Sequence, residues 1–178
     1  DWCMEHIFKP TIAAMNAEGR PFKGCLYFGL MLTPDGPKVI EYNCRFGDPE
    51  TQVVLPRLKT DFIDILEAVR EERLAELPIE WSEDACACVV MASGGYPAAY
   101  RKGLPIHGLD EKGQVPGAVV YHAGTRYDNE RFFTNGGRVL GVTASASTLE
   151  EALDKAYEAV ARIDFEGAHY RRDIGKTK

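Results

Sequence analysis

The chain has 178 residues, of which 45% are hydrophobic and 27% charged, and its formal net charge is −6. These values describe an ordinary globular chain of one domain or two small ones, and the acidic balance argues weakly against a nucleic-acid partner. No apolar run approaches the length of a membrane span, and no signal peptide is visible. Five cysteines without zinc spacing suit a reducing cytoplasm, where we expect the protein to act; they are Cys3, Cys25, Cys44, Cys86 and Cys88.

The first elements form a helix and a β-hairpin. Apolar residues at helical spacing predict a helix over Met4–Glu18 that Pro10 interrupts and Gly19 ends. The continuous apolar run Cys25–Leu32 predicts a strand that is covered on both faces. The turn residues of Thr33–Pro37 then predict that this strand pairs antiparallel with the strand that follows.

The second strand, which is ended by Gly47 and Pro49, carries polar groups on one face. Because side chains alternate along a strand, Glu41 and Asn43 lie on the same side, although a solvated edge strand would give the same pattern. Arg45 follows, and then Asp48-Pro49, which predicts a helix N-cap with proline at the first helical position. Oxygen ligands for a hard cation, an arginine and a helix N-terminus together indicate phosphate chemistry.

The rest of the chain predicts another helix and then a β-rich half. A helix is expected over residues 60–77, and a boundary after residue 80 gives domains 1–80 and 81–178. A capping box at Thr148–Glu151 opens a last helix through about Ile163, with Leu149 among its inward residues. The tight connection Asn135-Gly136-Gly137 is expected to join the last two strands. The predicted strands are Ala85–Ala92, Ala118–His122, Phe132–Thr134 and Arg138–Ser145.

Several segments, in the right order, resemble the phosphoribosylamine–glycine ligase family, also called glycinamide ribonucleotide synthetases, of the ATP-grasp superfamily. They are Glu41–Gln52, Ser93–Pro97, His122–Thr125, Thr134–Leu140 and Arg172–Gly175. The resemblance covers nearly all of the chain and implies that it is roughly the last two-fifths of a longer enzyme. The implied fold class is α+β: the C-terminal part of an ATP-grasp core, followed by a small antiparallel β-rich domain with a packed helix.

The resemblance also implies a reaction. The family joins glycine to 5-phosphoribosylamine through an acyl phosphate, with cleavage of ATP to ADP and phosphate, in de novo purine synthesis. Glu41 and Asn43 would hold Mg²⁺ or Mn²⁺ at the ATP phosphates, and Arg45 would stabilise the transferring phosphoryl group or the acyl phosphate. Many ATP-grasp enzymes have a further acidic ligand on the preceding strand, but this chain has no Asp or Glu between Gly24 and Thr33.

Further contacts follow from the resemblance. Asp48, Pro49 and Glu50 would place glycine or phosphate, and Ile40 would form part of an adenine floor, although plain core packing also explains Ile40. Gly136, Gly137 and Arg138 would approach the substrate phosphate or carboxylate, although a hairpin that needs flexible residues would look the same. Near the end of the chain, Arg171-Arg172-Asp173 is interpreted as an interdomain salt-bridge element or a solvated run.

The expected partners are small molecules and the upstream N-terminal part of the same enzyme, with no nucleic acid and no membrane. Because the lid that grips ATP would lie upstream, the chain alone is expected to be inactive. Two alternatives remain open. One is a sister ATP-grasp ligase or carboxylase of purine synthesis, and the other is a non-catalytic structural or binding module.

Overall fold

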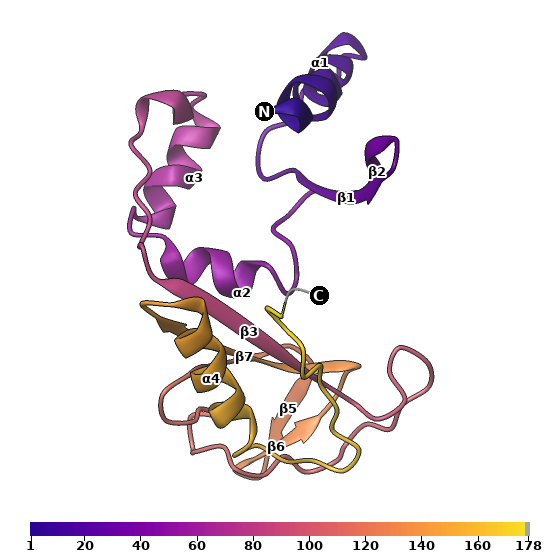
Figure 1. Cartoon of the computed structure of the whole chain (residues 1–178), viewed down its shortest axis with the longest axis vertical. Coiled ribbons are helices and arrows are strands. Elements are labelled where there is room, and N and C mark those ends of the chain that lie inside the picture. The colour runs from indigo at the N-terminus through magenta and orange to yellow at the C-terminus, as the bar shows by residue number, and fades with distance from the viewer. Residues whose placement is uncertain (177–178) are drawn as a thin grey trace. The chain divides into compact units, whose positions relative to one another are not determined.

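The computed structural model describes residues 1–176 and combines helices with antiparallel sheets (Figure 1). The fold class is α+β, as predicted. The chain divides into two compact units, one made of residues 1–48 and 59–80 and the other of Pro49–Leu58 together with the residues from Trp81 onwards. The segment Pro49–Leu58 therefore belongs with the second unit. The division into domains 1–80 and 81–178 stays a prediction.

The first helix runs across Pro10 without a break. A π-helical turn, η1 (Met4–Phe8), leads directly into α1 (Lys9–Ala17). The N–H of the first residue of α1 bonds to the carbonyl of the first residue of η1, five positions back, and the proline then lies in the first turn of α1, where a missing N–H is tolerated. The predicted interruption was wrong for this reason. Gly19, at φ +69°, follows the end of α1 as expected.

The strands β1 (Tyr27–Thr33) and β2 (Gly36–Asn43) form the predicted antiparallel hairpin. One side packs through aromatic rings, because the Phe28 ring lies 4.4 Å from that of Phe8 and 5.3 Å from that of Tyr42. The prediction that β1 is covered on both faces was wrong within the described residues. Its last apolar residues lie at the tip of a two-stranded hairpin, and Leu32 is 82% exposed.

The predicted helix over residues 60–77 is shorter. The chain forms α2 (Thr51–Val54) and η2 (Leu55–Arg57), followed by α3 (Phe62–Arg70) and η3 (Leu74–Glu76). The Asp61 carboxylate accepts a hydrogen bond of 2.8 Å from the Ile63 N–H and so caps the start of α3. The helix ends early because Glu72 takes the left-handed conformation, at φ +60°, and turns the chain away before η3.

As far as the structure describes it, the second unit has two antiparallel sheets. The larger has the strand order β3-β7-β4, and the smaller pairs β5 with β6. The predicted tight connection Asn135-Gly136-Gly137 does join the last two strands, β6 and β7, but these strands belong to different sheets and so do not pair as a hairpin. Strand β5 was missed in the sequence; its turn to β6 uses Asn129 and Glu130, both with positive φ. The bounds are β3 (Ala85–Ala92), β4 (Val119–His122), β5 (Thr125–Asp128), β6 (Arg131–Thr134) and β7 (Arg138–Ala146).

One helix, α4 (Leu149–Val160), packs against β3 and β7 to form the core (Figure 1). Thr148 Oγ1 accepts from the Glu151 N–H at 3.2 Å, which confirms the predicted cap. Leu149 was expected inside but is 48% exposed, because the buried face of α4 is narrow and made mainly of alanine. The fully buried side chains of this core include Val89, Met91, Leu140, Val142 and Phe165.

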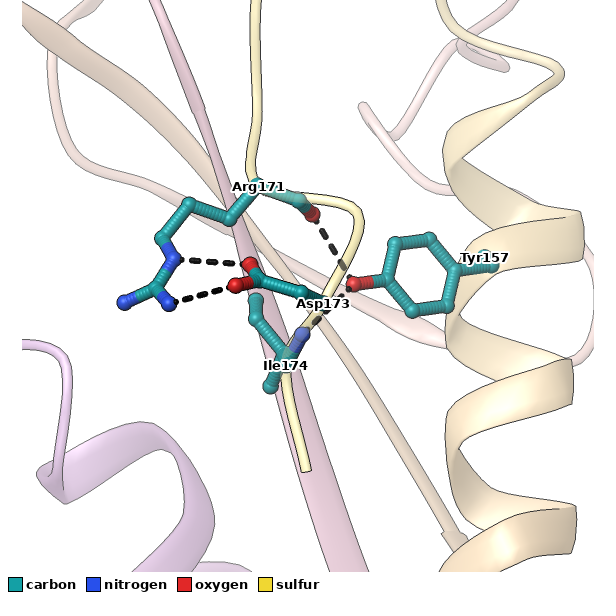
Figure 2. Close-up of polar contacts among 4 residues, drawn as sticks. All are labelled: Tyr157, Arg171, Asp173 and Ile174. Carbon is teal, nitrogen blue, oxygen red and sulfur yellow. Dashed lines mark hydrogen bonds and ion pairs between the residues drawn. The ribbon is translucent and has the colours of Figure 1, made fainter. Parts of the chain in front are cut away.

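The C-terminal segment is fixed by a local network (Figure 2). The Arg171 guanidinium donates two hydrogen bonds of 2.9 Å to the Asp173 carboxylate, and this hydrogen bonding lowers the pKa of Asp173. The Tyr157 hydroxyl of α4 donates to the Arg171 carbonyl at 2.8 Å and accepts from the Ile174 N–H at 3.3 Å. The ion pair therefore closes a turn within this segment, on the exposed surface.

Two glycines of the second unit allow the energetic cost of backbone strain to be compared with the cost of insufficient space for a side chain. Gly108, at φ +88°, leaves no room for a Cβ beside the Arg162 carbonyl oxygen, whereas Gly117, at φ +84°, faces open space. We expect Gly117→Ala to cost about 1–2 kcal/mol of unfolding free energy for the left-handed backbone. Gly108→Ala should cost about 1–3 kcal/mol more through overpacking. Denaturant unfolding of both variants measures the difference, and equal losses would show that the close approach to Arg162 is unimportant.

Candidate active site

The structure places Glu41 and Asn43 side by side at the end of β2. The Asn43 side-chain nitrogen, Nδ2, donates a hydrogen bond of 3.1 Å to Glu41 Oε1. Both side chains are accessible from solvent. The hydrogen bond uses one carboxylate oxygen and the amide nitrogen, which leaves the other carboxylate oxygen and the amide oxygen as acceptors.

A glycine on the neighbouring strand makes room for Glu41. Gly29 pairs directly with Glu41 across the hairpin, and a Cβ built on Gly29 would come within 2.7 Å of Glu41 Cγ. The carboxylate side chain therefore lies over the glycine. Sequence reasoning missed this residue, although a glycine inside an apolar strand is a known signal of close approach.

A β-bulge lies next to this pair. Gly29 pairs with Glu41 and Leu30 with Val39, so Ile40 is the extra residue of β2. Ile40 is 62% exposed, and no described residue buries it. Plain core packing, one of the two interpretations of Ile40, therefore does not describe it in this structure.

Arg45 lies just past the end of β2. Its Nη1 donates a hydrogen bond of 2.9 Å to the neighbouring Phe46 carbonyl, and its side chain is exposed. The Phe46 ring is itself anchored, 5.7 Å from the ring of Phe62. Within the described residues, the guanidinium bonds to this carbonyl rather than to Glu41 or Asn43.

The residues after Arg45 do not form the predicted helix start. Asp48, Pro49 and Glu50 form a turn, and the helix α2 begins two residues later than expected, at Thr51, with Glu50 at the N-cap. The predicted cap at Asp48 was wrong because the turn takes up the proline before helical bonding begins. Since α2 is a single turn, its dipole gives little attraction for an anion.

The segment Gly136–Arg138 leads into β7 in the second unit. Gly137 is buried against the ring of Tyr96, and its carbonyl accepts a hydrogen bond of 2.8 Å from the Ser93 N–H. Arg138 is exposed. The glycines therefore serve close packing at a crossing between sheets, and the hairpin interpretation does not apply.

Other possible sites lack the features of the predicted one. Among the described residues, no group of three or more His, Cys, Asp or Glu side chains could hold a metal ion. None of the helices described here is both long and apolar enough to cross a membrane. A cavity of about 700 Å³ lies between α4 and the C-terminal segment, and its described walls include none of the predicted site residues.

Comparison with known proteins identifies the family. The model of the phosphoribosylglycinamide synthetase ATP-grasp (A) domain matches residues 1–51. The model of the phosphoribosylglycinamide synthetase C domain matches residues 86–177, more than half of the chain. The chain belongs to the phosphoribosylglycinamide synthetase family. The resemblance on which the sequence analysis relied is thereby confirmed.

Individual relatives agree with this assignment. The chain is 51% identical over 170 residues to phosphoribosylamine–glycine ligase of Caldanaerobacter subterraneus, covering 96% of this chain and 40% of the relative. It is 50% identical over 172 residues to the trifunctional purine biosynthetic protein adenosine-3 of Gallus gallus, covering 96% of this chain and 17% of the relative. The chain thus spans about two-fifths of the length of the single-function ligase.

A solved structure supports the fold. The crystal structure of phosphoribosylamine–glycine ligase from Thermotoga maritima superposes with a TM-score of 0.80 at 37% identity, covering 96% of this chain and 41% of that one. The described helices and antiparallel sheets are therefore those of the C-terminal region of an ATP-grasp ligase.

The role of Gly29 can be tested directly. In the chain, Gly29→Ala should displace the Glu41 side chain and break its hydrogen bond with Asn43, because the new Cβ occupies the space of Glu41 Cγ. Nuclear magnetic resonance should show this as a shift of the Asn43 side-chain amide signals. The control is Gly141→Ala, a strand glycine of the second unit, which should leave these signals in place. Unchanged Asn43 signals in Gly29→Ala would contradict the packing described here.

Proposed function

We propose that this chain is the C-terminal part of a phosphoribosylamine–glycine ligase. In this reaction the glycine carboxylate attacks the γ-phosphorus of ATP and releases ADP, and the amine of 5-phosphoribosylamine then attacks the acyl phosphate carbonyl. Phosphate leaves, the amine loses a proton, and glycinamide ribonucleotide forms. The observation that carries the proposal is that Glu41 and Asn43 lie side by side on β2 and offer oxygen ligands for a metal ion, in a chain of this family.

The donor set of this pair fits Mg²⁺ or Mn²⁺ bound together with ATP. One carboxylate and one amide oxygen are too few for a cage made only of protein ligands, and the described residues contain no acidic cluster that would complete one. Mg²⁺ typically keeps several waters and binds through one or two carboxylates plus substrate phosphates. Such an ion would neutralise phosphate charge as the γ-phosphoryl group moves. Glu41 supplies the formal charge, and Asn43 orients the carboxylate through its hydrogen bond.

We assign Arg45 to the transferring group. Among the described residues, its exposed guanidinium bonds only to the neighbouring Phe46 carbonyl, and this hydrogen bond can be exchanged for bonds to phosphoryl oxygens at small cost. A planar guanidinium binds two oxygens at once and stabilises negative charge as it develops. Arg45 would act on the γ-phosphoryl group in the first step and on the acyl phosphate in the second.

The remaining assignments concern the substrates. The turn Asp48-Pro49-Glu50 would place glycine or phosphate through the backbone N–H groups of Asp48, Glu50 and the turn that follows. The exposed Ile40 would contact the adenine ring. Gly136 and Gly137 would hold Arg138 against the phosphate of 5-phosphoribosylamine. The relatives are more than twice as long as this chain, and the upstream part would grip ATP. The ligase would act in the cytoplasm.

The metal assignment predicts the effect of Glu41→Gln in the full-length ligase. Turnover should fall by about 10²–10³-fold, because a formal charge next to the cation is lost. Folding should be nearly unchanged, since the Glu41 side chain is exposed. Steady-state kinetics at saturating Mg²⁺ and a thermal melt measure both effects. Glu76→Gln, at an exposed position of η3, is the matched control, and normal turnover in Glu41→Gln would refute the role.

The assignment of Arg45 predicts a different pattern. In the full-length ligase, Arg45→Lys should lower kcat by about 10²-fold or more while ATP affinity changes little, because lysine offers a point charge where arginine binds two oxygens. Arg57→Lys, which alters an arginine bonded to the Ser82 carbonyl, provides the control. A surface role for Arg45 would instead give a drop in kcat of less than about fivefold, within the range of an exposed ion pair.

A further inference from the structure

Ser93 connects the end of β3 to the Gly136–Gly137 segment. The residue is completely buried. Its hydroxyl donates a hydrogen bond of 2.8 Å to the Gly136 carbonyl, and its N–H donates one of 2.8 Å to the Gly137 carbonyl. Its own carbonyl accepts from the Tyr96 N–H at 3.0 Å. A single side chain and its peptide therefore fix two successive carbonyls of the segment before Arg138.

The same segment is enclosed from other directions. A Cβ on Gly137 would overlap the ring of Tyr96, and a Cβ on Gly136 would lie 2.9 Å from the Gly124 Cα. The Asn135 N–H donates a hydrogen bond of 2.7 Å to the Gly124 carbonyl. Because backbone or ring atoms meet these glycines on two further sides, the peptide planes of Gly136 and Gly137 have little freedom to rotate. The hydroxyl of Ser93 is the side-chain group that bonds to the Gly136 carbonyl and so holds the peptide plane between Gly136 and Gly137.

This orientation matters for the arginine that follows. Arg138 is the first residue of β7, pairs with Ala92 at the end of β3, and is exposed. A guanidinium binds a phosphate well only when its two N–H groups face two oxygens, so the direction of approach is as important as the charge. A change in the preceding peptide planes would turn the Arg138 backbone and misdirect its side chain.

We propose that Ser93 is a positioning residue for the phosphate monoester of 5-phosphoribosylamine, acting through the Gly136–Gly137 peptides on Arg138. The proposal rests on the proposed ligase function. It adds a buried hydroxyl, far along the sequence from Arg138, that determines how tightly one substrate binds. Glycine and ATP, which lack this contact, should be unaffected by it.

The test is Ser93→Ala in the full-length ligase, which removes the hydroxyl and leaves the Gly136 carbonyl without this donor. We expect KM for 5-phosphoribosylamine to rise on the order of tenfold, while kcat and the KM values for ATP and glycine stay within about twofold. Arg138→Ala should raise the same KM at least as much. If Ser93→Ala does not fold, Ser93→Cys, with its weaker S–H donor, serves in its place.

Thr148→Ala is the control for a general loss of stability. It removes a side-chain hydrogen bond to the backbone at the start of α4, in the same compact unit. Its KM for 5-phosphoribosylamine should stay unchanged. Equal increases in Thr148→Ala and Ser93→Ala would reduce Ser93 to a structural residue and overturn the proposal.

The remaining outcomes separate this inference from the function beneath it. If Arg138→Ala raises KM for 5-phosphoribosylamine and Ser93→Ala does not, the positioning role is wrong and the ligase assignment stands. If neither variant changes that KM in an active enzyme, Arg138 does not hold the phosphate, and the inference falls with it. If the unaltered full-length protein forms no ADP in the presence of glycine and 5-phosphoribosylamine, the proposed function itself fails.

Discussion

The candidate site depends on the way β2 presents two side chains to the same side. Residues two apart on a strand share a face, so Asn43 can donate its hydrogen bond to Glu41. The neighbouring strand contributes the absence of a side chain at Gly29, which makes room for the Glu41 side chain. Because both side chains are held on one strand, their oxygen atoms are positioned before a metal ion binds, which reduces the free energy cost of binding.

Local patterns in the sequence predicted that Glu41 and Asn43 lie side by side. Features that depend on a distant partner were not predicted. The alternation that puts Glu41 and Asn43 together is visible in the sequence, as are β3 and the cap at Thr148. The bulge at Ile40 and the space over Gly29 depend on the pairing register of two strands, which no local signal fixes. The helix start after Asp48 was misplaced because the cap signal is satisfied equally by a turn.

Glycine was the least predictable residue type, because a lack of space and a need for freedom produce the same letter. The bend of a hairpin was one explanation of Gly136 and Gly137, yet neither is among the described glycines with positive φ. They are small because Tyr96 and Gly124 approach them closely. Strand β5 escaped prediction because its turn has no glycine at all, using Asn129 and Glu130. For Gly136 and Gly137 the deciding atoms come from elsewhere in the chain, whereas the turn between β5 and β6 is made by two residues that are not typical turn formers together.

We propose that Glu41 and Asn43 together bind the metal of the ATP complex. The test is to measure the affinity of the full-length ligase for Mn²⁺ with saturating ATP, using the electron paramagnetic resonance signal of free Mn²⁺ as the readout. Glu41→Gln, Asn43→Ala and the double variant are compared with the unaltered protein. We expect weaker Mn²⁺ binding in each single variant and a non-additive effect in the double variant, as for ligands of one ion. Equal Mn²⁺ affinity in all four proteins would contradict it.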